Sequence, residues 1–489
     1  MISKNLLKSS FIYTFIGALP LASAFFLLPF YTNYLSKSDF GLLALYISFS
    51  AFIQIIINSG LDTYIGISFF EHKGHEDKLN SQIGSIAAYL LLLGIIVIFL
   101  LTVFGNPIFS LIFKNSEMHF FPFGLMSVLT AFFNSFFKTY TNLLINQKRP
   151  DRFLWVNSAN FIMTIGFSLT GLLMYPFSLT GPIWGRFLSG VGIFIIALYS
   201  FQNEFGLRFK FGSTFRNAFT FSLPVLIFFF LQWIVSNNYP YIIDHLMTTE
   251  DIAMFDFAVK CTLLIEFALS GLSSAIMPNV FALLKNKALK GSTPELNKYF
   301  STFTAVSLVV IPFLTLIIPI LVPLVKIKAD YFEAFIFIAI LGISFVSRGL
   351  YNYFLAPIYF FKKTKVLPKI YLFTAIIQIT ASIIFIKYWG LWGAVWASLL
   401  TKILQNVFLY LEARRFFIFR FNKLKLIILP LLVISLISIS EAFFSYQNLF
   451  WKHLTQFLFS FLLVTIVYRK EIIDFSTFIW KTYFRKINN

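Results

Sequence analysis

The chain has 489 residues, of which 58% are hydrophobic and only 12% are charged. Soluble domains carry about 25% charged residues, and their apolar cores stop growing at roughly 250 to 300 residues. The 67 phenylalanines and a mean hydropathy of +0.81 therefore exclude a soluble globular protein. Because about 20 apolar residues span a bilayer, the sequence predicts an all-α, polytopic membrane protein.

The sequence lacks the motifs that redox, metal or nucleotide chemistry requires. Its one cysteine, Cys261, excludes an intrachain disulfide and a thiolate metal cluster. A Walker lysine loop, a dinucleotide-binding glycine motif and a G-x-S-x-G nucleophile turn are absent. We therefore predict that the protein is not an enzyme and uses no cofactor, no bound metal and no ATP-driven step of its own.

Hydropathy predicts fourteen membrane-spanning helices. The first resembles a secretory signal, but its apolar stretch continues to Tyr31 and is long enough to remain as a span. After the last span, apolar residues recur at helical spacing beside basic ones, which indicates a surface helix over 472–486. The predicted spans are 10–34, 40–68, 81–104, 119–146, 153–175, 179–202, 216–239, 250–283, 299–323, 331–361, 367–387, 390–412, 424–443 and 448–468.

Lysine and arginine are distributed unequally over the loops between these spans. With a cytoplasmic N-terminus, 28 of the 39 Lys and Arg residues lie on the cytoplasmic side, 6 on the opposite side and 5 within spans. A wrong helix count would disturb this alternation, since cytoplasmic loops carry the excess of Lys and Arg. Much of the formal charge of +19 therefore comes from the basic cytoplasmic loops, and no nucleic-acid partner is expected. With fourteen spans, both termini are predicted to be cytoplasmic.

The two halves of the chain resemble each other at an offset of 212 residues. Residues 35–42, LSKSDFGL, align with 247–254, MTTEDIAM, and residues 179–185 align with 391–397. The alternative explanation is that Gly and Trp merely recur at similar helix starts, without a true internal repeat. Six predicted spans separate the copies, so they share one orientation, as in transporters built from parallel repeats around a cavity. The predicted parts are an N-terminal lobe over 1–212, a C-terminal lobe over 213–420, and helices thirteen and fourteen with a tail over 421–489.

Charged residues within the predicted spans are candidates for function. A cation that faces lipid at the bilayer centre costs at least ~2.5 kcal/mol, so these side chains should face protein or water. An excess of cations over acids in an interior cavity favours an anionic substrate such as a phosphate or carboxylate. The candidate substrate-binding residues are Arg348, Lys402, Lys138, Arg186 and Lys260. The candidates for gating or ion coupling are Asp62, Asp256 and Glu266.

These candidates differ in their sequence surroundings. Arg348 lies near the middle of its span with no acid within one helical turn, which makes it the leading substrate ligand, and Lys402 lies on a polar helix face. Asp256 and Lys260 stand four residues apart in the favoured order for an ion pair, so Lys260 binds either substrate or its own neighbour. Arg186 lies close to the end of its span, where it can bind substrate or reach the membrane surface.

Three segments resemble a known family of membrane proteins. LLPFYTNYLSKSDFGLLALY, NSGLDTYIGISFFEH and DHLMTTEDIAMFDFAVK are similar to the polysaccharide transporters of the MOP exporter superfamily, the Wzx-type flippases related to MurJ and MATE exporters. The resemblance covers essentially the whole chain, through short hydrophobic motifs. It implies two six-helix lobes that alternate access to a cavity. It also implies that the cargo is an undecaprenyl-diphosphate-linked oligosaccharide (an O-antigen, capsule or exopolysaccharide unit), moved across the bacterial inner membrane.

The resemblance carries further expectations and leaves alternatives open. It implies contact with membrane lipids and with polysaccharide polymerase and chain-length regulator proteins. Asp62 matches the family's acid at the cytoplasmic end of helix two, whereas Asn33, Ser68 and His245 stand where relatives often carry arginine. A MATE-like, cation-coupled exporter of small molecules remains the alternative function, although it should have more buried acids than cations. A membrane glycosyltransferase or polymerase would require a large outer loop with catalytic residues, and the predicted outer loops are short.

Overall fold

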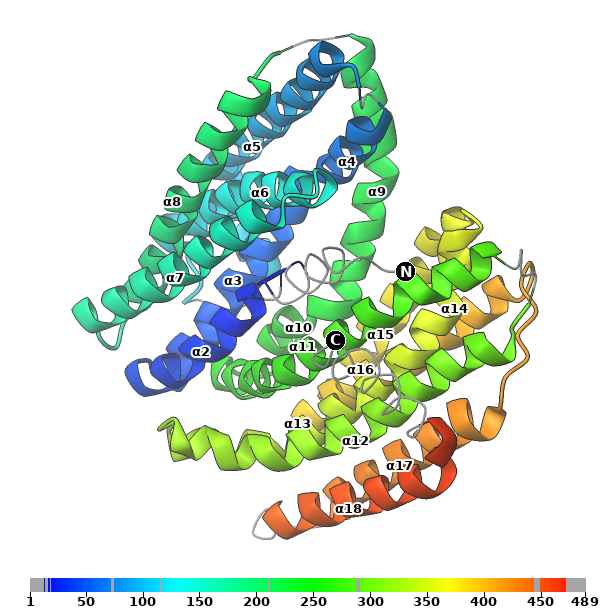
Figure 1. Ribbon diagram of the computed structural model, residues 1–489. Coiled ribbons are helices and arrows are strands. Elements are labelled where there is room, and N and C mark those ends of the chain that lie inside the picture. Colours follow the sequence, from blue (N-terminus) through cyan, green and yellow to red (C-terminus); the bar gives the residue numbers. More distant parts are fainter. Residues whose placement is uncertain are drawn as a thin grey trace, which may run out of the picture. The chain divides into compact units, whose positions relative to one another are not determined.

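The computed structural model describes residues 13, 16–17, 19–71, 74–114, 117–209, 212–286, 291–443 and 449–471. Within these ranges the chain consists of helices joined by short connections (Figure 1). The all-α fold predicted from hydropathy is thus confirmed. Part of the first predicted span and the predicted surface helix over 472–486 lie outside the described residues.

The helices follow the predicted spans closely, apart from the breaks described below. In the first half of the chain they are α2 (Leu19–Tyr34), α3 (Lys37–Asn58), α4 (Leu61–Glu71), α5 (Glu76–Ile112), η1 (Phe120–Gly124), α6 (Leu125–Asn146), α7 (Pro150–Met174), α8 (Thr180–Phe205), α9 (Ser213–Asn237) and α10 (Tyr239–Leu246). In the second half they are α11 (Thr249–Asn286), α12 (Pro294–Leu324), η2 (Ala329–Ala334), α13 (Phe335–Ile343), η3 (Ser344–Ser347), α14 (Arg348–Phe360), η4 (Thr364–Val366), α15 (Leu367–Trp389), α16 (Leu391–Ala413), η5 (Leu424–Ile428), α17 (Leu429–Phe443) and α18 (Leu449–Val467).

Twelve helical segments among the described residues are long and apolar enough to cross a membrane. They correspond to twelve of the fourteen predicted spans. The other two predicted spans correspond to α2, of which 16 residues are described, and to α11, a helix of 38 residues with acids in its first turn. At 1.5 Å per residue, α11 extends ~57 Å, which exceeds the ~30 Å of the hydrocarbon core.

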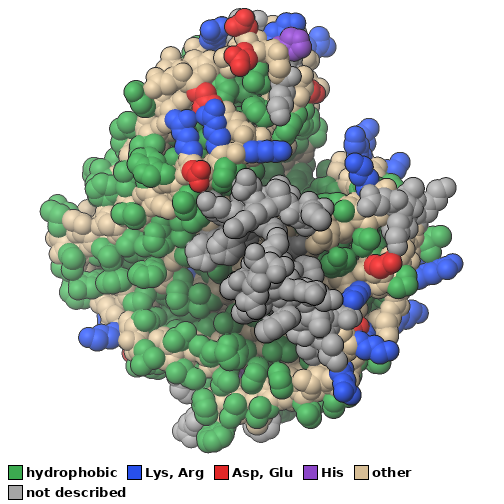
Figure 2. Space-filling model, viewed as in Figure 1, with side chains coloured by type: hydrophobic (Ala, Val, Ile, Leu, Met, Phe, Trp, Pro, Cys, Tyr) green, Lys and Arg blue, Asp and Glu red, His purple; other side chains and the backbone are tan. Residues whose placement is uncertain are grey.

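The long helices expose large apolar side chains. Along α5, Ile95, Phe99 and Val103 are 58%, 66% and 54% exposed. Figure 2 shows broad hydrophobic areas on the molecular surface, with charged side chains gathered in separate patches. Exposed apolar surface on this scale is typical of membrane contact. The protein is therefore a multi-pass membrane protein.

The chain divides into two compact units. The first contains Met1–Asp256 and Ser382–Gly390, and the second contains Phe257–Ala381 and Leu391–Asn489. The boundary between them lies inside α11, whereas the predicted lobes meet at residue 212. Compact packing in one conformation does not define which parts move together, so the predicted lobes stay a prediction.

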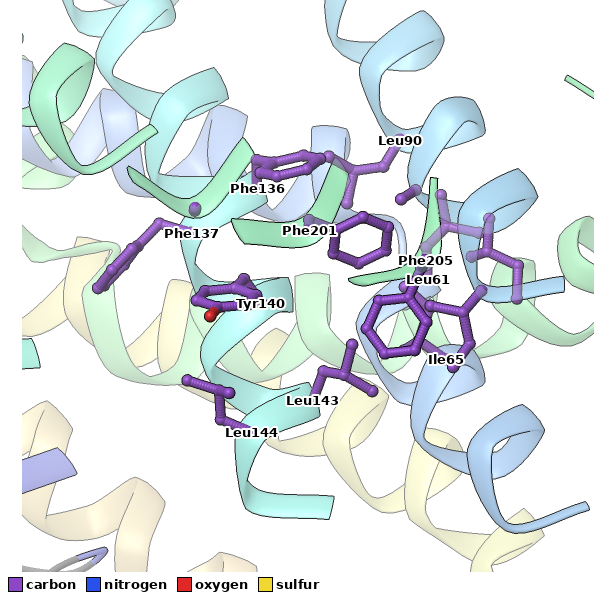
Figure 3. Close-up of a cluster of buried hydrophobic side chains, with 14 of the residues drawn as sticks. Leu61, Ile65, Leu90, Phe136, Phe137, Tyr140, Leu143, Leu144, Phe201 and Phe205 are labelled. Carbon is purple, nitrogen blue, oxygen red and sulfur yellow. The ribbon is translucent and has the colours of Figure 1, made fainter. Parts of the chain in front are cut away.

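An aromatic core in the first unit fixes α4 against its neighbours. Phe136 of α6 and Phe201 of α8 are fully buried, with ring centroids 5.7 Å apart in an edge-to-face arrangement. Figure 3 shows these rings near Leu61 and Ile65, which belong to α4. Since lipid is as apolar as these side chains, close packing rather than exclusion of water holds such helices together. The core thereby determines where the polar residues of α4 and α6 lie.

Two helices of the predicted repeat begin with the same cap. Ser36 Oγ accepts the N–H of Asp39 at 3.0 Å and donates to its carboxylate at 2.6 Å at the start of α3. Thr248, which lies 212 residues later, donates to the Asp251 carboxylate at 2.6 Å and accepts its N–H at 3.3 Å at the start of α11. Reciprocal caps of this kind satisfy free groups of the first turn. The two segments therefore share local structure as well as sequence.

The capped ends of α3 and α11 touch each other. Ser38 Oγ and Thr249 Oγ1 are 2.9 Å apart. Gly41 packs so closely on the other helix that a Cβ atom there would lie 2.0 Å from the carbonyl oxygen of Thr249. Small residues permit such close approach of helix backbones in membranes. In the predicted orientation, this contact lies on the extracytoplasmic side.

Several predicted spans are broken in the structure. The span 40–68 is divided into α3 and α4 at Ser59 and Gly60, where φ is 47° and 77°. Glycine adopts this left-handed conformation readily, which makes Gly60 the natural point for the break. The span 331–361 is divided by the 3₁₀ segment η3, and a short extra helix, α10, follows the span 216–239. The predicted boundary between two spans near Gly390 is confirmed, because α15 ends at Trp389 and α16 begins at Leu391.

The orientation of the chain can be tested by thiol labelling. The only cysteine, Cys261, is buried and can be replaced by serine. Single cysteines are then placed at Asn115, in a predicted outer loop outside the described residues, and at Lys363, an exposed residue of a predicted cytoplasmic loop. We expect a membrane-impermeant maleimide to label intact cells at 115 and not at 363. The reverse result would invert the topology, and labelling at both sites would contradict the helix count.

Candidate functional site

The first charged cluster lies at the break between α3 and α4. We call it the Asp62 cluster, and it comprises Asp62, Thr63, Lys138 and Asn142. Asp62 Oδ1 accepts the N–H of Thr63 at 2.8 Å, and Oδ2 accepts the Asn142 amide at 3.0 Å. Lys138 Nζ lies 4.0 Å from the same oxygen. Asp62 stands in the first turn of α4, where free N–H groups and the helix dipole favour a carboxylate.

The Asp62 carboxylate is buried, whereas half of the Lys138 side chain is exposed, at 4% and 51% respectively. The ring of Phe229 lies 5.8 Å from Lys138 Nζ, within the range of a cation–π contact. A pocket of about 360 Å³ opens beside the cluster, lined by Asp62, Thr63, Gly66, Ile67, Phe70, Asn142, Ile145 and Asn146. Apolar walls with a few fixed carboxylate and amide groups suit a polar ligand such as a sugar.

The second charged cluster lies at the 3₁₀ segment η3 in the other unit. We call it the Arg348 cluster, and it comprises Glu266, Ser344, Arg348 and Lys402. Lys402 Nζ donates to Ser344 Oγ at 2.7 Å and lies 4.3 Å from the centroid of the Phe345 ring. Arg348 begins α14 one turn after Ser344, and its guanidinium lies 3.7 Å from Glu266 Oε1 on α11. Irregular segments of this kind at membrane depth are tolerated where they line a cavity or are buried in protein.

The Arg348 cluster corrects one sequence inference. Arg348 has no acid within a helical turn, but the fold brings Glu266 to it from another helix. The two side chains are 29% and 36% exposed, and a single long contact joins them. Glu266 and Arg348 are also close enough for their charges to act on Lys402. The cluster holds two cations and one carboxylate, so it retains one positive charge for a ligand.

Arg186 faces the interior of the first unit. It lies with Ser50, Ser127 and Thr130 beside a small cavity between α3, α6 and α8. Among the described residues, no carboxylate lies within ion-pair distance of it. This position favours a role inside the protein over contact with the membrane surface. Arg186 belongs to neither charged cluster, so its role in binding stays a prediction.

Asp256 and Lys260 are both buried on α11. Asp256 Oδ1 accepts a hydrogen bond from the hydroxyl of Tyr239 at 2.8 Å. That partner was not foreseen from the sequence, because Tyr239 lies on a different helix. The ion pair between Asp256 and Lys260 stays a prediction.

One buried ionic group was missed altogether from the sequence. Glu441 of α17 is an acid within a predicted span that was not among the candidates, and its Oε2 lies 2.6 Å from Lys452 Nζ of α18. Their side chains are 0% and 4% exposed. The sequence places Lys452 near the end of its span, which suggests a loop residue. The presence of Glu441 in an otherwise apolar span is the signal that would have found the pair.

Comparison with known proteins identifies the family. The sequence model of the family described as polysaccharide biosynthesis protein matches residues 6–284, which is more than half of the chain. The chain belongs to this family. No curated protein matches the sequence. The family match confirms the resemblance to polysaccharide-biosynthesis proteins that the sequence motifs indicated.

Solved structures of known transporters share the fold. The Lipid II flippase MurJ in an inward closed conformation is similar over 94% of this chain and 99% of its own, with 16% identity and a TM-score of 0.71. An inward-facing multidrug resistance MATE family transporter of the MOP superfamily is similar over 82% of this chain and 94% of its own, with 14% identity and a TM-score of 0.66. At these identities the likeness shows the MurJ- and MATE-like fold alone. It confirms the predicted fold class, for which about fourteen spans are expected.

Proposed function

We propose that this polysaccharide biosynthesis protein is a flippase for a polyprenyl-diphosphate-linked oligosaccharide in the bacterial inner membrane. The observation that carries the proposal is the positive balance of the Arg348 cluster at a break in a membrane-spanning helix. A diphosphate supplies oxygens that match the planar fork of arginine and the point charge of lysine. The family's role in polysaccharide biosynthesis supports a glycan as the remainder of the substrate.

In this proposal each residue of the Arg348 cluster has a distinct role. Arg348 binds two phosphate oxygens through its guanidinium, and Lys402, held in place by Ser344, binds a third. When no substrate is present, the carboxylate of Glu266 pairs with the Arg348 guanidinium in place of the substrate's phosphate group. The substrate must displace this carboxylate, so Glu266 weakens binding and assists release. No covalent bond is made or broken.

The Asp62 cluster provides the second part of the proposal. Its carboxylate, its amide and the neighbouring Asn146 line a pocket of about 360 Å³. Such groups bind sugar hydroxyls in both directions, as acceptors and as donors. In the predicted orientation this pocket lies towards the cytoplasmic ends of α4 and α6. We infer that it receives sugar residues of a substrate that enters from the cytoplasmic leaflet.

A binding competition tests the charge requirement. Purified protein is incubated with a radiolabelled undecaprenyl-diphosphate-linked sugar, and unlabelled competitors are added. We expect undecaprenyl diphosphate to compete best, undecaprenyl monophosphate ~10-fold less well, and uncharged undecaprenol still less well, because each hydrogen bond to a charged group contributes ~1.5–3 kcal/mol. Equal competition by undecaprenol would contradict an anionic binding site.

The MATE-like alternative has one observation in its favour. Asp62 is a buried acid within a predicted span, and buried acids in membrane proteins commonly take part in ion coupling. However, Lys138 and Asn142 already compensate its carboxylate. The alternative predicts that the protein exports ethidium and that Asp62→Asn abolishes the export. Our proposal predicts no ethidium export in either protein.

A further inference from the structure

A short extended segment of the second unit joins α16 to η5. We call it the basic strap, and it comprises residues 414–423, RRFFIFRFNK. Its middle is bound to the chain that leads into α12. The N–H of Ser292 donates to the carbonyl oxygen of Ile418 at 2.8 Å, and the Asn297 amide donates to that of Arg420 at 2.6 Å. The two segments thereby form a short parallel bridge, which fixes the strap in place (Figure 1).

Alternate side chains of the strap face opposite ways, as in a β-strand. Phe417 is fully buried, and the ring centroid of Phe419 lies 5.3 Å from that of Tyr353 on α14. Ile418, which stands between the two phenylalanines, is 57% exposed, and Arg420 is exposed as well. The aromatic face therefore anchors the strap to α14, and the other face presents an apolar and a basic side chain outwards.

Packing brings the strap beside a second basic segment, the connection between α14 and α15. The ring centroid of Phe361 in this connection lies 6.0 Å from that of Phe416 and 6.2 Å from that of Phe417. The two segments, about 50 residues apart in the chain, thus present their exposed cations together. We call this set the basic surface. It comprises Lys362, Lys363, Lys365, Arg414, Arg415 and Arg420.

The charge of the basic surface is largely uncompensated. Glu412 at the end of α16 pairs with Arg415 at 2.8 Å. Among the residues that the structure describes, no carboxylate lies within ion-pair distance of the other members. In the first unit, by contrast, Arg149 and Arg152 both lie against Glu204, at 2.8 and 3.4 Å. Topology explains why cytoplasmic loops are basic, but it does not require that cations of different loops gather on one surface.

The basic surface lies where membrane-spanning helices end. α14 ends at Phe360 and α16 at Ala413, both on the predicted cytoplasmic side, so the strap lies near the depth of the lipid headgroups. Arginine presents a planar fork that matches the oxygens of a phosphate group. An apolar side chain beside basic ones is typical of segments at the membrane surface, where the apolar group enters the boundary with the acyl chains. The exposed Ile418 therefore favours membrane lipids over an acidic protein in water.

We propose that the basic surface binds anionic phospholipids of the cytoplasmic leaflet, with phosphatidylglycerol as the simplest example. The guanidinium groups of Arg414 and Arg420 bind headgroup phosphates, and Ile418 lies among the upper parts of the acyl chains. The lysines of the α14–α15 connection add to the attraction, since each basic residue near an anionic headgroup strengthens binding. The inference does not depend on which substrate the protein transports.

A fluorescent label on the strap tests this surface. Ile418→Cys is made in Cys261→Ser protein, labelled with an apolar bimane group and reconstituted in phosphatidylcholine liposomes. The liposomes contain a small fraction of phosphatidylglycerol or of phosphatidylcholine with a nitroxide quencher on the upper acyl chain. We expect half-maximal quenching at a ~10-fold lower mole fraction of the labelled phosphatidylglycerol, because each basic residue near it contributes a factor of about five. Equal quenching by the two lipids would overturn the proposal.

Variants assign the preference to the strap. Arg414→Gln combined with Arg420→Gln should bring the two lipids within about twofold of each other. The matched control combines Arg208→Gln with Arg216→Gln, an equal loss of charge at exposed arginines of the first unit, and should keep the preference. Because the two lipids are compared within each variant, a change in overall stability does not affect the ratio.

Two other outcomes would contradict the assignment. A preference that survives in the Arg414, Arg420 variant, or that is lost equally in the control, would show that the attraction is spread over the whole cytoplasmic face. Poly-glutamate provides the test for an acidic protein. If it protected the bimane group from aqueous iodide while the two labelled lipids quenched equally, the surface would bind an acidic protein and the lipid proposal would be wrong.

Discussion

Replacing Arg348 by glutamine is expected to lower the rate of glycan-lipid transport by ~10- to 100-fold at unchanged protein abundance. The guanidinium supplies charged hydrogen bonds to the diphosphate, each of which contributes ~1.5–3 kcal/mol. Lys402→Gln should cause a loss of similar size, because Ser344 already positions its ammonium group for a ligand. Arg348→Lys should recover only part of the rate, since lysine keeps the charge but lacks the planar fork. The rate is measured in liposomes, with abundance checked by immunoblot.

Two further variants make this experiment specific. Arg216→Gln removes an exposed arginine at the start of α9 and should leave the rate unchanged. Glu266→Gln removes the carboxylate that competes for Arg348, so it should tighten binding of undecaprenyl diphosphate several-fold. Full transport by Arg348→Gln would remove the leading residue from the proposed site. Weaker binding in Glu266→Gln would show that the carboxylate supports the site rather than competing for it.

A disulfide between residues 38 and 249 is expected to stop transport completely. Ser38 Oγ and Thr249 Oγ1 are 2.9 Å apart at the capped ends of α3 and α11, within reach for two cysteine side chains. If these ends must separate to open the extracytoplasmic side, a covalent bond between them prevents one half of the cycle. The double variant Ser38→Cys, Thr249→Cys is made in Cys261→Ser protein and oxidised in liposomes. Its transport rate is compared before and after reduction.

The controls distinguish a lock from simple damage. Each single cysteine variant should transport at the normal rate with and without oxidant. Reduction of the double variant should restore the rate, because the bond and not the substitutions would cause the loss. Normal transport by the fully oxidised double variant would show that these ends stay together through the cycle. Alternating access would then require a different opening.

The sequence was most informative where a property repeats along the chain. Apolar stretches of about 20 residues and the alternating charges of the loops predicted the spans, because both follow from the thickness and electrostatics of a membrane. The capping residues Ser36 and Thr248 could be aligned because a cap depends on a few neighbouring residues. Helix breaks were harder to predict. Gly60 lies within a stretch apolar enough to be predicted as one helix, and η3, with the sequence SFVS, contains no glycine or proline that would mark a break.

The candidate site was only partly accessible from the sequence. The cost of placing a charge in lipid singled out Asp62, Lys138, Arg348 and Lys402, and in the structure each of them has a polar or charged partner on another helical segment. Their partners could not be predicted, because Glu266 reaches Arg348 from a helix about 80 residues away in the chain, and only tertiary packing brings the two together. The buried group around Glu441 was missed for a related reason. Lys452 and His453 lie near a helix end, where polar residues usually meet water.

The central claim is that the protein moves an anionic, polyprenyl-linked glycan across a membrane. The most direct measurement is the transfer of a fluorescent undecaprenyl-diphosphate-linked sugar between the leaflets of liposomes that contain the purified protein. A membrane-impermeant quencher reports the fraction that has reached the inner leaflet. We predict that the labelled lipid moves rapidly between the leaflets when the wild-type protein is present, so that the fraction protected from the quencher changes quickly. With Arg348→Gln, the rate of this change should be close to that in protein-free liposomes. Transfer no faster than in protein-free liposomes, together with export of ethidium that depends on Asp62, would contradict the account.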